Sequence, residues 1–232
     1  RMRGNLLRAI SHDLRTPLTS IYGSSSTLMI KYDALPKEQQ LKLLGEIRED
    51  SEWLIRMVEN LLSVTRIDDS KVEVVKTPTV LDELIDSVLM KFSKKHPNQK
   101  VITRIPDDFV DIPMDSILIE QVLLNLLENA VFHAKGMTEL SLSVSLVENQ
   151  AVFEVADNGC GIPEDALHQI FTGNYEKTAA PVDGTRSNMG IGLSVCAAII
   201  KAHGSEIFAE NRKSGGAVFR FALERGGDDD GQ

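Results

Sequence analysis

Residues able to carry nucleophilic chemistry stand close together near the start of the chain. The stretch SHDLRTPLTS contains His12, Asp13 and Thr16. An exposed imidazole with a pKa of about 6.5 is a fair nucleophile, and an adjacent carboxylate can take its ring proton as phosphate arrives. The alternative is that His12 is a solvated surface side chain, so the interpretation depends on which way it points.

The apolar residues around His12 predict a packing seam that leaves this histidine facing water. They recur at alternating steps of three and four residues, as Leu7, Ile10, Leu14, Pro17, Ile21, Ser24 and Leu28. In heptad terms His12 then falls at position f, with Thr16 one turn further on the same face. Pro17 cannot donate a hydrogen bond to the carbonyl of Asp13, so we expect the helix to kink or loosen at His12.

A second helix with the same periodicity predicts a helical hairpin over residues 1–68. Its apolar stripe runs through Leu44, Ile47, Ser51, Leu54, Val58, Leu61 and Thr65. Two helices alone rarely bury a wide apolar face, so we expect a homodimer in which two hairpins form a four-helix bundle.

The rest of the chain shows a different pattern and predicts a second domain of the α+β class. Residues 69–78 are expected to form a linker and residues 79–225 the domain, with Thr79 and Asp82 as a capping box for its first helix. Short strand patterns alternate irregularly with three longer helices, which indicates an α/β sandwich. The tail, residues 226–232, is expected to be disordered.

The apolar helix EQVLLNLLENAVFHA carries two amides, Asn125 and Asn129, one turn apart. Asparagine is a modest helix former, and side-chain oxygens at this spacing suit contacts to Mg²⁺ and phosphate. The alternative is a pair of amides on an ordinary helix surface.

Glycine-rich turns follow that helix at two places. In DNGCGIP, Asp157 is placed to accept a hydrogen bond from an exocyclic amine, while Gly159 and Gly161 let backbone approach a flat ligand closely; a simple tight turn is the alternative. Residues 172–188 form a long loop that predicts a lid or disorder. Gly190 and Gly192 then open a helix whose N-terminus is suited to phosphate.

The composition narrows the partners and the compartment. A formal net charge of −9 argues against a nucleic-acid partner, which would favour a basic face. The two cysteines show no metal-ligand spacing, which indicates a reducing compartment. With no long apolar segment and no signal peptide, the sequence predicts a soluble, cytoplasmic fragment of a longer chain.

Taken together, these motifs resemble those of bacterial sensor histidine kinases. SHDLRTPLTS resembles the H-box, in which a histidine on a dimeric hairpin is phosphorylated by ATP. The two asparagines, DNGCGIP and MGIGLS resemble the N, G1 and G2 boxes of the Bergerat ATP-binding fold, and SGGAVFRFAL resembles its closing glycine turn and strand. The amino-acid sequence of these motifs looks most similar to that of KdpD-type, potassium-responsive kinases.

The resemblance implies a role for each of these residues. ATP would lie between the sheet and the lid, with Asp157 on adenine, Asn129 on Mg²⁺ and Asn125 near the phosphates. The turn containing Gly190, Gly192 and Leu193 would hold the phosphate chain. His12 would attack the γ-phosphate, with Asp13 as general base, and the phosphoryl group would pass to the receiver domain of a response regulator. Thr16 resembles the residue that orients water for dephosphorylating the regulator, and the full-length chain would be linked to a membrane.

The sequence departs from the family at one position that bears on ATP binding. Phe132 and His133 stand where the family commonly has a lysine and an aromatic residue, which removes an expected phosphate contact; Lys135 or Lys177 are candidate replacements.

Two other functions also remain open for this sequence. One is an ATP hydrolase of the gyrase or chaperone type, although those enzymes carry a glutamate where Asn125 stands. The other is a non-catalytic dimeric scaffold or a kinase-dead phosphatase.

Overall fold

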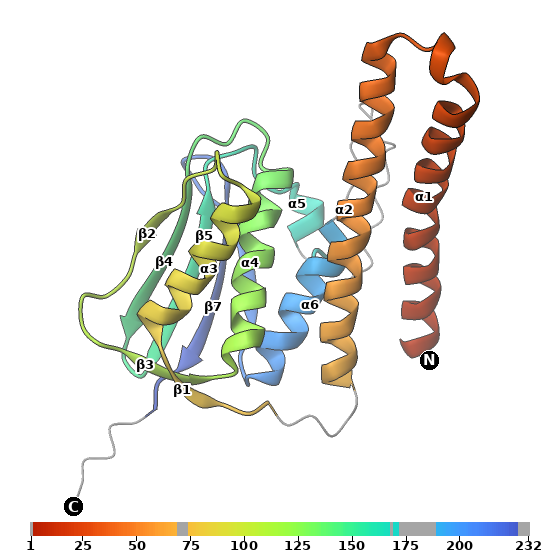
Figure 1. Ribbon diagram of the computed structural model, residues 1–232. Helices are drawn as coiled ribbons and strands as arrows, with labels where there is room; N and C mark the ends of the chain where they lie inside the picture. The colour runs from red at the N-terminus through yellow and green to blue at the C-terminus, as the bar shows by residue number, and fades with distance from the viewer. Residues whose placement is uncertain (1, 69–73, 168, 172–188, 227–232) are drawn as a thin grey trace, which may run out of the picture. The chain divides into compact units, whose positions relative to one another are not determined.

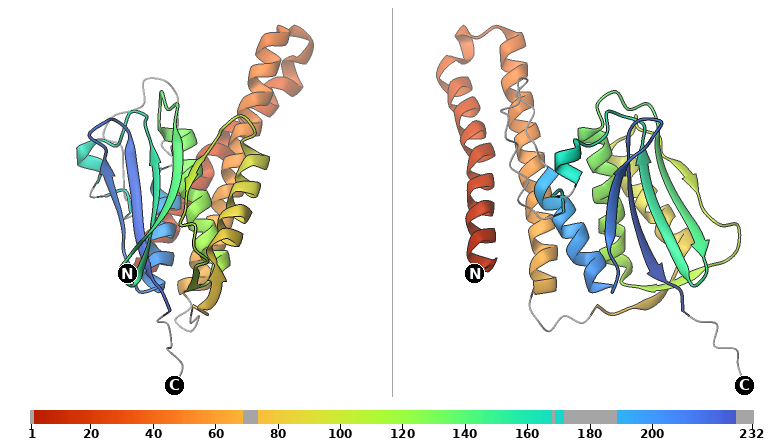
Figure 2. Two further views of the ribbon diagram at one scale, coloured as in Figure 1. Left: turned by 90° about the vertical axis from the view of Figure 1, so that its left-hand side faces the viewer. Right: turned by 180° about the vertical axis from the view of Figure 1, so that it is seen from behind.

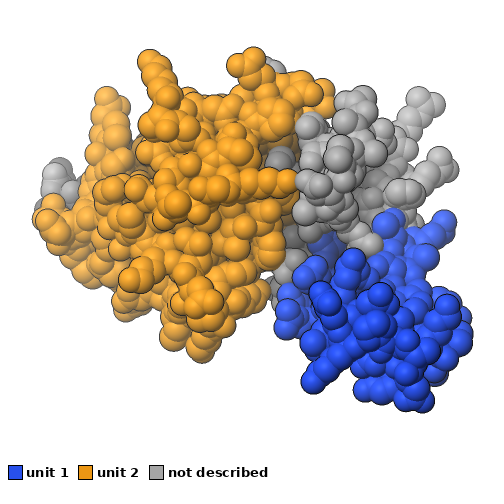
Figure 3. Space-filling view, turned by 90° about the horizontal axis from the view of Figure 1, so that it is seen from above, with its two compact units in different colours: residues 1–62 blue, residues 63–232 orange. Residues whose placement is uncertain are grey.

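The computed structural model describes residues 2–68, 74–167, 169–171 and 189–226, with side chains except at 2–13, 56–57, 59–68 and 189–191. The chain divides into two compact units, residues 1–62 and residues 63–232, which Figure 3 colours separately. Among the described residues, none of the helices is long and apolar enough to cross a membrane.

The first unit is a helical hairpin. Helix α1 spans Met2–Lys31, a short 3₁₀ helix η1 spans Tyr32–Ala34, and helix α2 begins at Lys37 and runs to Asp68 (Figure 1). The side-chain amide of Gln40 closes the turn by donating to the carbonyls of Tyr32 (2.8 Å) and Leu35 (3.0 Å). The helix α1 continues through Pro17, so the expected loosening at His12 does not end it.

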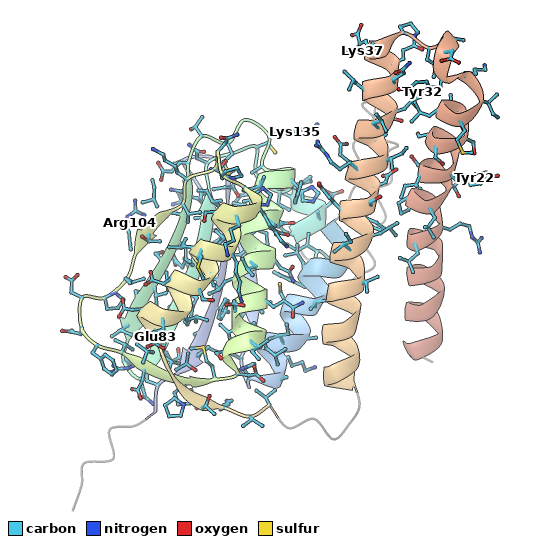
Figure 4. The ribbon with its side chains drawn as sticks, in the orientation of Figure 1. Tyr22, Tyr32, Lys37, Glu83, Arg104 and Lys135 are labelled. Atoms are coloured by element: carbon cyan, nitrogen blue, oxygen red, sulfur yellow. The ribbon has the colours of Figure 1, made fainter. Side chains whose placement is uncertain are left out.

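The described part of the predicted seam is the more buried side of α1. Pro17, Ser24 and Leu28 are buried, and the Ser24 hydroxyl donates to Glu46 on α2 (3.1 Å). Many apolar side chains of the hairpin nevertheless remain exposed, and Figure 4 labels two that project from it, Tyr22 and Tyr32. Others are Leu18, Met29, Ile30, Leu41, Leu44, Ile55 and Val58. One hairpin therefore leaves much apolar surface in water.

The second unit is built on a five-stranded sheet with the strand order β2-β4-β5-β7-β6. Strand β2 is parallel to β4, and all other neighbours are antiparallel. A separate two-stranded antiparallel sheet joins β1 to β3. The strands are β1 Thr77–Val80, β2 Ile102–Arg104, β3 Asp111–Met114, β4 Leu140–Val147, β5 Gln150–Asp157, β6 Ile207–Asn211 and β7 Ala217–Glu224.

One face of the sheet carries the core of this unit. Along β5 the side chains of Ala151, Phe153 and Val155 are buried and their neighbours are more exposed, as alternation on a one-sided sheet requires. Phe153 stacks on Phe221 of β7 with ring centroids 4.9 Å apart. Long helices cover this face (Figure 2). The helices of the unit are α3 Leu81–Lys95, α4 Ser116–His133, α5 Glu164–Leu167 and α6 Met189–Ala202.

The start of this unit differs from the sequence-based expectation. Thr79 does not cap α3: it lies in β1, where its hydroxyl donates to the Thr77 carbonyl (3.0 Å), and the N-cap of α3 is Val80 without a side-chain cap bond. The capping-box prediction was wrong because pairing of β1 with β3 fixes residues 77–80 as extended backbone. For the same reason a strand begins inside the segment expected to be linker.

A buried histidine joins the end of α6 to the start of α4. His203 is 4% exposed; its Nδ1 lies 2.8 Å from the Ile199 carbonyl and its Nε2 accepts the backbone N–H of Asp115 (3.1 Å). A carbonyl only accepts and an N–H only donates, so these contacts specify the neutral ring with its hydrogen on Nδ1. Burial lowers the pKa of His203 below its usual 6.5, and the Lys76 ammonium, which donates to the His203 carbonyl, lowers it further.

We expect the stability of this domain to fall as the pH drops below about 6.5, because the unfolded chain then binds a proton at His203 that the native site resists. The loss reaches at most about 1.4 kcal/mol per pH unit and ends at the lowered folded-state pKa. Urea unfolding at several pH values between 5 and 8 measures it. His203→Gln should remove this part of the slope; an unchanged slope in that variant would contradict the assignment.

Candidate functional site

The backbone of α1 carries the H-box residues on one continuous helix. His12 and Asp13 lie in this helix, and their side chains are outside the described residues. Thr16 is described and exposed, and helical geometry places it one turn beyond His12. The structure therefore supplies the helix that the phospho-acceptor hypothesis requires.

The two amides of α4 lie one turn apart and are both half-buried. Asn125 is hydrogen-bonded to the thiol of Cys196 on α6. Cys196 is completely buried, and this burial raises its pKa to about 12, so the group is a neutral thiol at physiological pH. Asn125 is thus oriented toward α6, the helix that begins at the second glycine motif.

Asp157, at the end of β5, is 4% exposed and its carboxylate is held by backbone. Its Oδ1 accepts the N–H of Gly159 at 2.8 Å and that of Ala217, across in β7, at 3.4 Å. Both of these bonds end on Oδ1, which leaves Oδ2 turned away from them. A carboxylate fixed in this way presents one oxygen as an acceptor for a ligand.

The rest of the turn from Asp157 to Ile162 is clamped from both sides. The side chain of Asn158 accepts the N–H groups of Thr138 (2.9 Å) and Glu139 (2.8 Å), just before β4. Asn211, at the end of β6, accepts the N–H of Ile162 (2.8 Å) and donates to its carbonyl (2.6 Å). Sequence reasoning missed both amides, because their partners become neighbours only in the folded sheet.

The two glycines of this turn are required by the protein's own atoms. A Cβ on Gly159 would lie 2.7 Å from the Cβ of Ala134, just after α4. Gly161 has a φ of +73°, and a Cβ there would lie 2.8 Å from the Asn211 Oδ1. The sequence predicts that these glycines admit a flat ligand; internal packing by itself already disfavours a side chain at both positions.

The second glycine motif forms the first turn of α6. Gly190 and Gly192 lie in this helix, with Gly192 half-buried. The side chain of Leu193 is buried in the core, so any contact of this residue with phosphate would come from its backbone. Residues 172–188, which the sequence predicts to be a lid or disordered, lie outside the described residues, and so does the candidate Lys177.

Comparison with known families assigns both units. Residues 2–70 match the His Kinase A (phospho-acceptor) domain, and residues 114–227 match the histidine kinase-, DNA gyrase B-, and HSP90-like ATPase family. The chain belongs to the histidine kinases. The first match includes His12, and the second includes the α4 amides, Asp157 and the α6 glycines of this kinase chain.

Relatives of this histidine kinase chain support the same assignment. The sensor protein KdpD of Clostridium acetobutylicum is 39% identical over 226 residues, covering 97% of this chain and 25% of the relative. KdpD of Escherichia coli K12 is 34% identical, covering 96% of this chain and 24% of the relative. The chain thus spans about a quarter of these proteins, and the predicted KdpD-type resemblance is confirmed.

Solved structures confirm the predicted fold class. The histidine kinase ThkA, in complex with the response regulator protein TrrA, matches with a TM-score of 0.72 and 25% identity, covering 96% of this chain and 62% of ThkA. Acinetobacter baumannii histidine kinase AdeS matches with a TM-score of 0.66 and 23% identity, covering 92% of this chain and 98% of AdeS. Histidine kinases therefore share this combination of a helical region and an α/β domain.

The kinase chain places an aromatic ring where the family commonly has a lysine. Phe132 is 44% exposed at the end of α4, and its ring meets the edge of His96 with centroids 5.8 Å apart. Lys135, one of the two candidate replacements, is exposed in the turn just after α4 (Figure 4).

Gly216 tests how tightly the Asp157 turn is packed. A Cβ at Gly216 would lie 2.1 Å from the Asp157 carbonyl oxygen, so Gly216→Ala must displace this turn, and we expect it to cost about 3 kcal/mol or more. Gly204→Ala is the matched control: its φ of +83° is similar to the +87° of Gly216, but no atom lies within 4 Å. The control should lose only about 1 kcal/mol. Urea unfolding of both variants measures this, and equal losses would contradict the packing argument.

Proposed function

We propose that this chain is the catalytic portion of a two-component sensor kinase, which transfers the γ-phosphoryl group of ATP to His12 and then to an aspartate of a response regulator. The observation that carries the proposal is the presence, in one chain, of a region that matches the phospho-acceptor domain and a region that matches the ATPase family.

The ATPase-type domain supports binding of ATP as the phosphoryl donor. The Oδ2 of Asp157 would accept the exocyclic amine of adenine, because among the described residues the backbone hydrogen bonds to this carboxylate end on Oδ1. The amide oxygen of Asn129 is a ligand of the class that Mg²⁺ prefers. When bound with ATP, Mg²⁺ would neutralise charge on the phosphates, which is most of what phosphoryl transfer requires from its surroundings.

The chemical step follows from the residue types on α1. A ring nitrogen of His12 forms a bond to the γ-phosphorus as the bond to the bridging oxygen breaks and ADP leaves, and Asp13 takes the ring proton. The phosphoryl group then moves from nitrogen to a carboxylate oxygen of the regulator. Asn125 supports transfer over hydrolysis, because an amide cannot take a proton from water.

The hairpin supports a homodimer and a regulator as partners. Its exposed apolar side chains, among them Leu41, Leu44 and Val58, provide surface for a second copy to bury in a four-helix bundle. The ThkA neighbour was solved with a response regulator, which supports a receiver domain as the partner here. We further propose that the catalytic portion is cytoplasmic and that the full-length protein is linked to a membrane.

Phosphatase activity toward the regulator is the second candidate function. Thr16 is exposed on the H-box helix, one turn from His12, where it can orient a water molecule. Phe132 favours a variant of this hypothesis in which kinase activity is lost and only the phosphatase or a scaffold remains, because phenylalanine offers no phosphate contact. A measurement of ATP binding at millimolar concentration with Mg²⁺ separates the scaffold from the kinase, because only the kinase must bind ATP.

Transfer of label from γ-labelled ATP with Mg²⁺ tests the kinase proposal. We expect label on the chain that is lost in acid, survives alkali and is absent from His12→Gln, because a phosphohistidine is acid-labile and needs the imidazole. His168→Gln is the control, since this histidine belongs to neither predicted motif.

Other outcomes decide between the alternatives. Bound ATP without label would favour the phosphatase, and no ATP binding would favour the scaffold. Release of phosphate without a labelled protein, unchanged in His12→Gln, would favour an ATP hydrolase.

A further inference from the structure

The backbone carbonyl of Asp157 accepts a hydrogen bond from an arginine in the connection between β6 and β7. Arg212, which directly follows β6, donates from Nη1 to the Asp157 carbonyl oxygen at 3.0 Å. The ladder between β5 and β7 ends one residue earlier, at the pair Ala156 and Val218. The guanidinium therefore supplies a hydrogen bond at the point where pairing with β7 has ended, while β4 still pairs with Asp157 through Leu140.

The arginine is itself fixed in place. Its backbone N–H donates to the Gly216 carbonyl (2.9 Å), and its own carbonyl accepts the N–H of Gly215 (3.0 Å), which closes the turn between β6 and β7. The side chain is half-buried and lines a concave part of the sheet together with Glu154 and Arg220. A planar, preorganised donor in such a turn gives its acceptor a defined position.

The position of the Asp157 carboxylate bears on which nucleotide base the site would recognise. Adenine presents an amine hydrogen at its six-position, whereas guanine presents an acceptor oxygen there. The orientation of the Asp157 carboxylate is set through Oδ1 by Gly159 and Ala217, and its main chain is set by Arg212. Sites built around a fixed polar group discriminate strongly against the wrong partner, and they lose discrimination when that group moves.

We propose that Arg212 is a positioning residue for base recognition, which sets the preference for adenine over guanine nucleotides by holding Asp157 through its carbonyl. This inference rests on the proposed function, in that Asp157 must read the base. Arg212 touches the strand end and acts on the nucleotide only through Asp157.

Dissociation constants for ADP and GDP with Mg²⁺, measured by calorimetry on the whole chain, test the proposal. Arg212→Met keeps an apolar stem and removes the donor; it should weaken ADP binding about 5- to 20-fold and change GDP binding less than about 2-fold, so that the preference falls. Arg212→Lys keeps a donor and should recover part of the preference. The ratio is measured within each variant and does not depend on how much of the sample is folded.

Arg220→Ala is the matched control. Its guanidinium lines the same concave surface but binds Glu154 (2.6 Å) and Glu210 (3.4 Å), with no bond to Asp157. It should leave the preference unchanged, and a loss equal to that of Arg212→Met would overturn the proposal.

The remaining outcomes separate this inference from the function on which it rests. Binding of ADP by the wild-type chain with an unchanged preference in Arg212→Met would overturn the role of Arg212 alone. Equal weakening of ADP and GDP would show a merely structural role and overturn it as well. If the wild-type chain binds neither nucleotide, the proposed kinase function fails together with the inference.

Discussion

The close approach of Gly216 to the end of β5 is the constraint on which the candidate nucleotide site depends. Only a glycine fits against the Asp157 carbonyl, and this contact lets Ala217 reach the carboxylate and Arg212 reach the carbonyl. The same turn also follows Asn211, whose side chain is hydrogen-bonded to the backbone N–H and carbonyl of Ile162, at the end of the turn 157–162. The closing glycines of the domain thus shape the turn around Asp157, although they stand far from it in sequence.

The two amides of α4 depend on a different contact, between α4 and α6. The thiol of Cys196 meets Asn125, and burial keeps this thiol neutral, so the amide is oriented toward α6 by an uncharged partner. An alcohol or a charged group at this position would need further partners to offset its burial. Helix α6 is also tied to the start of α4 through His203. The amides and the second glycine motif are therefore parts of one packed unit.

Sequence periodicity predicted those elements whose fold is decided locally. The apolar segment EQVLLNLLENAVFHA lies almost entirely within α4, because burial imposes a fixed period on a helix. The Thr79 cap failed since tertiary pairing overrode a local signal. Arg212 and Asn211 were not predictable: their partners lie 55 and 49 residues away, and no local pattern encodes that distance. The roles of the His12 and Asp13 side chains stay a prediction.

The two units differ in how much of their apolar surface they bury, and this difference agrees with their proposed roles. The α/β unit buries its large side chains within one core, as a site that must hold a base in fixed geometry requires. The hairpin leaves leucines and tyrosines in water, as an element completed by a second copy does. Phosphoryl transfer depends mainly on how donor and acceptor are positioned. This chain carries the ATPase-type domain and the phospho-acceptor helix in two separate compact units.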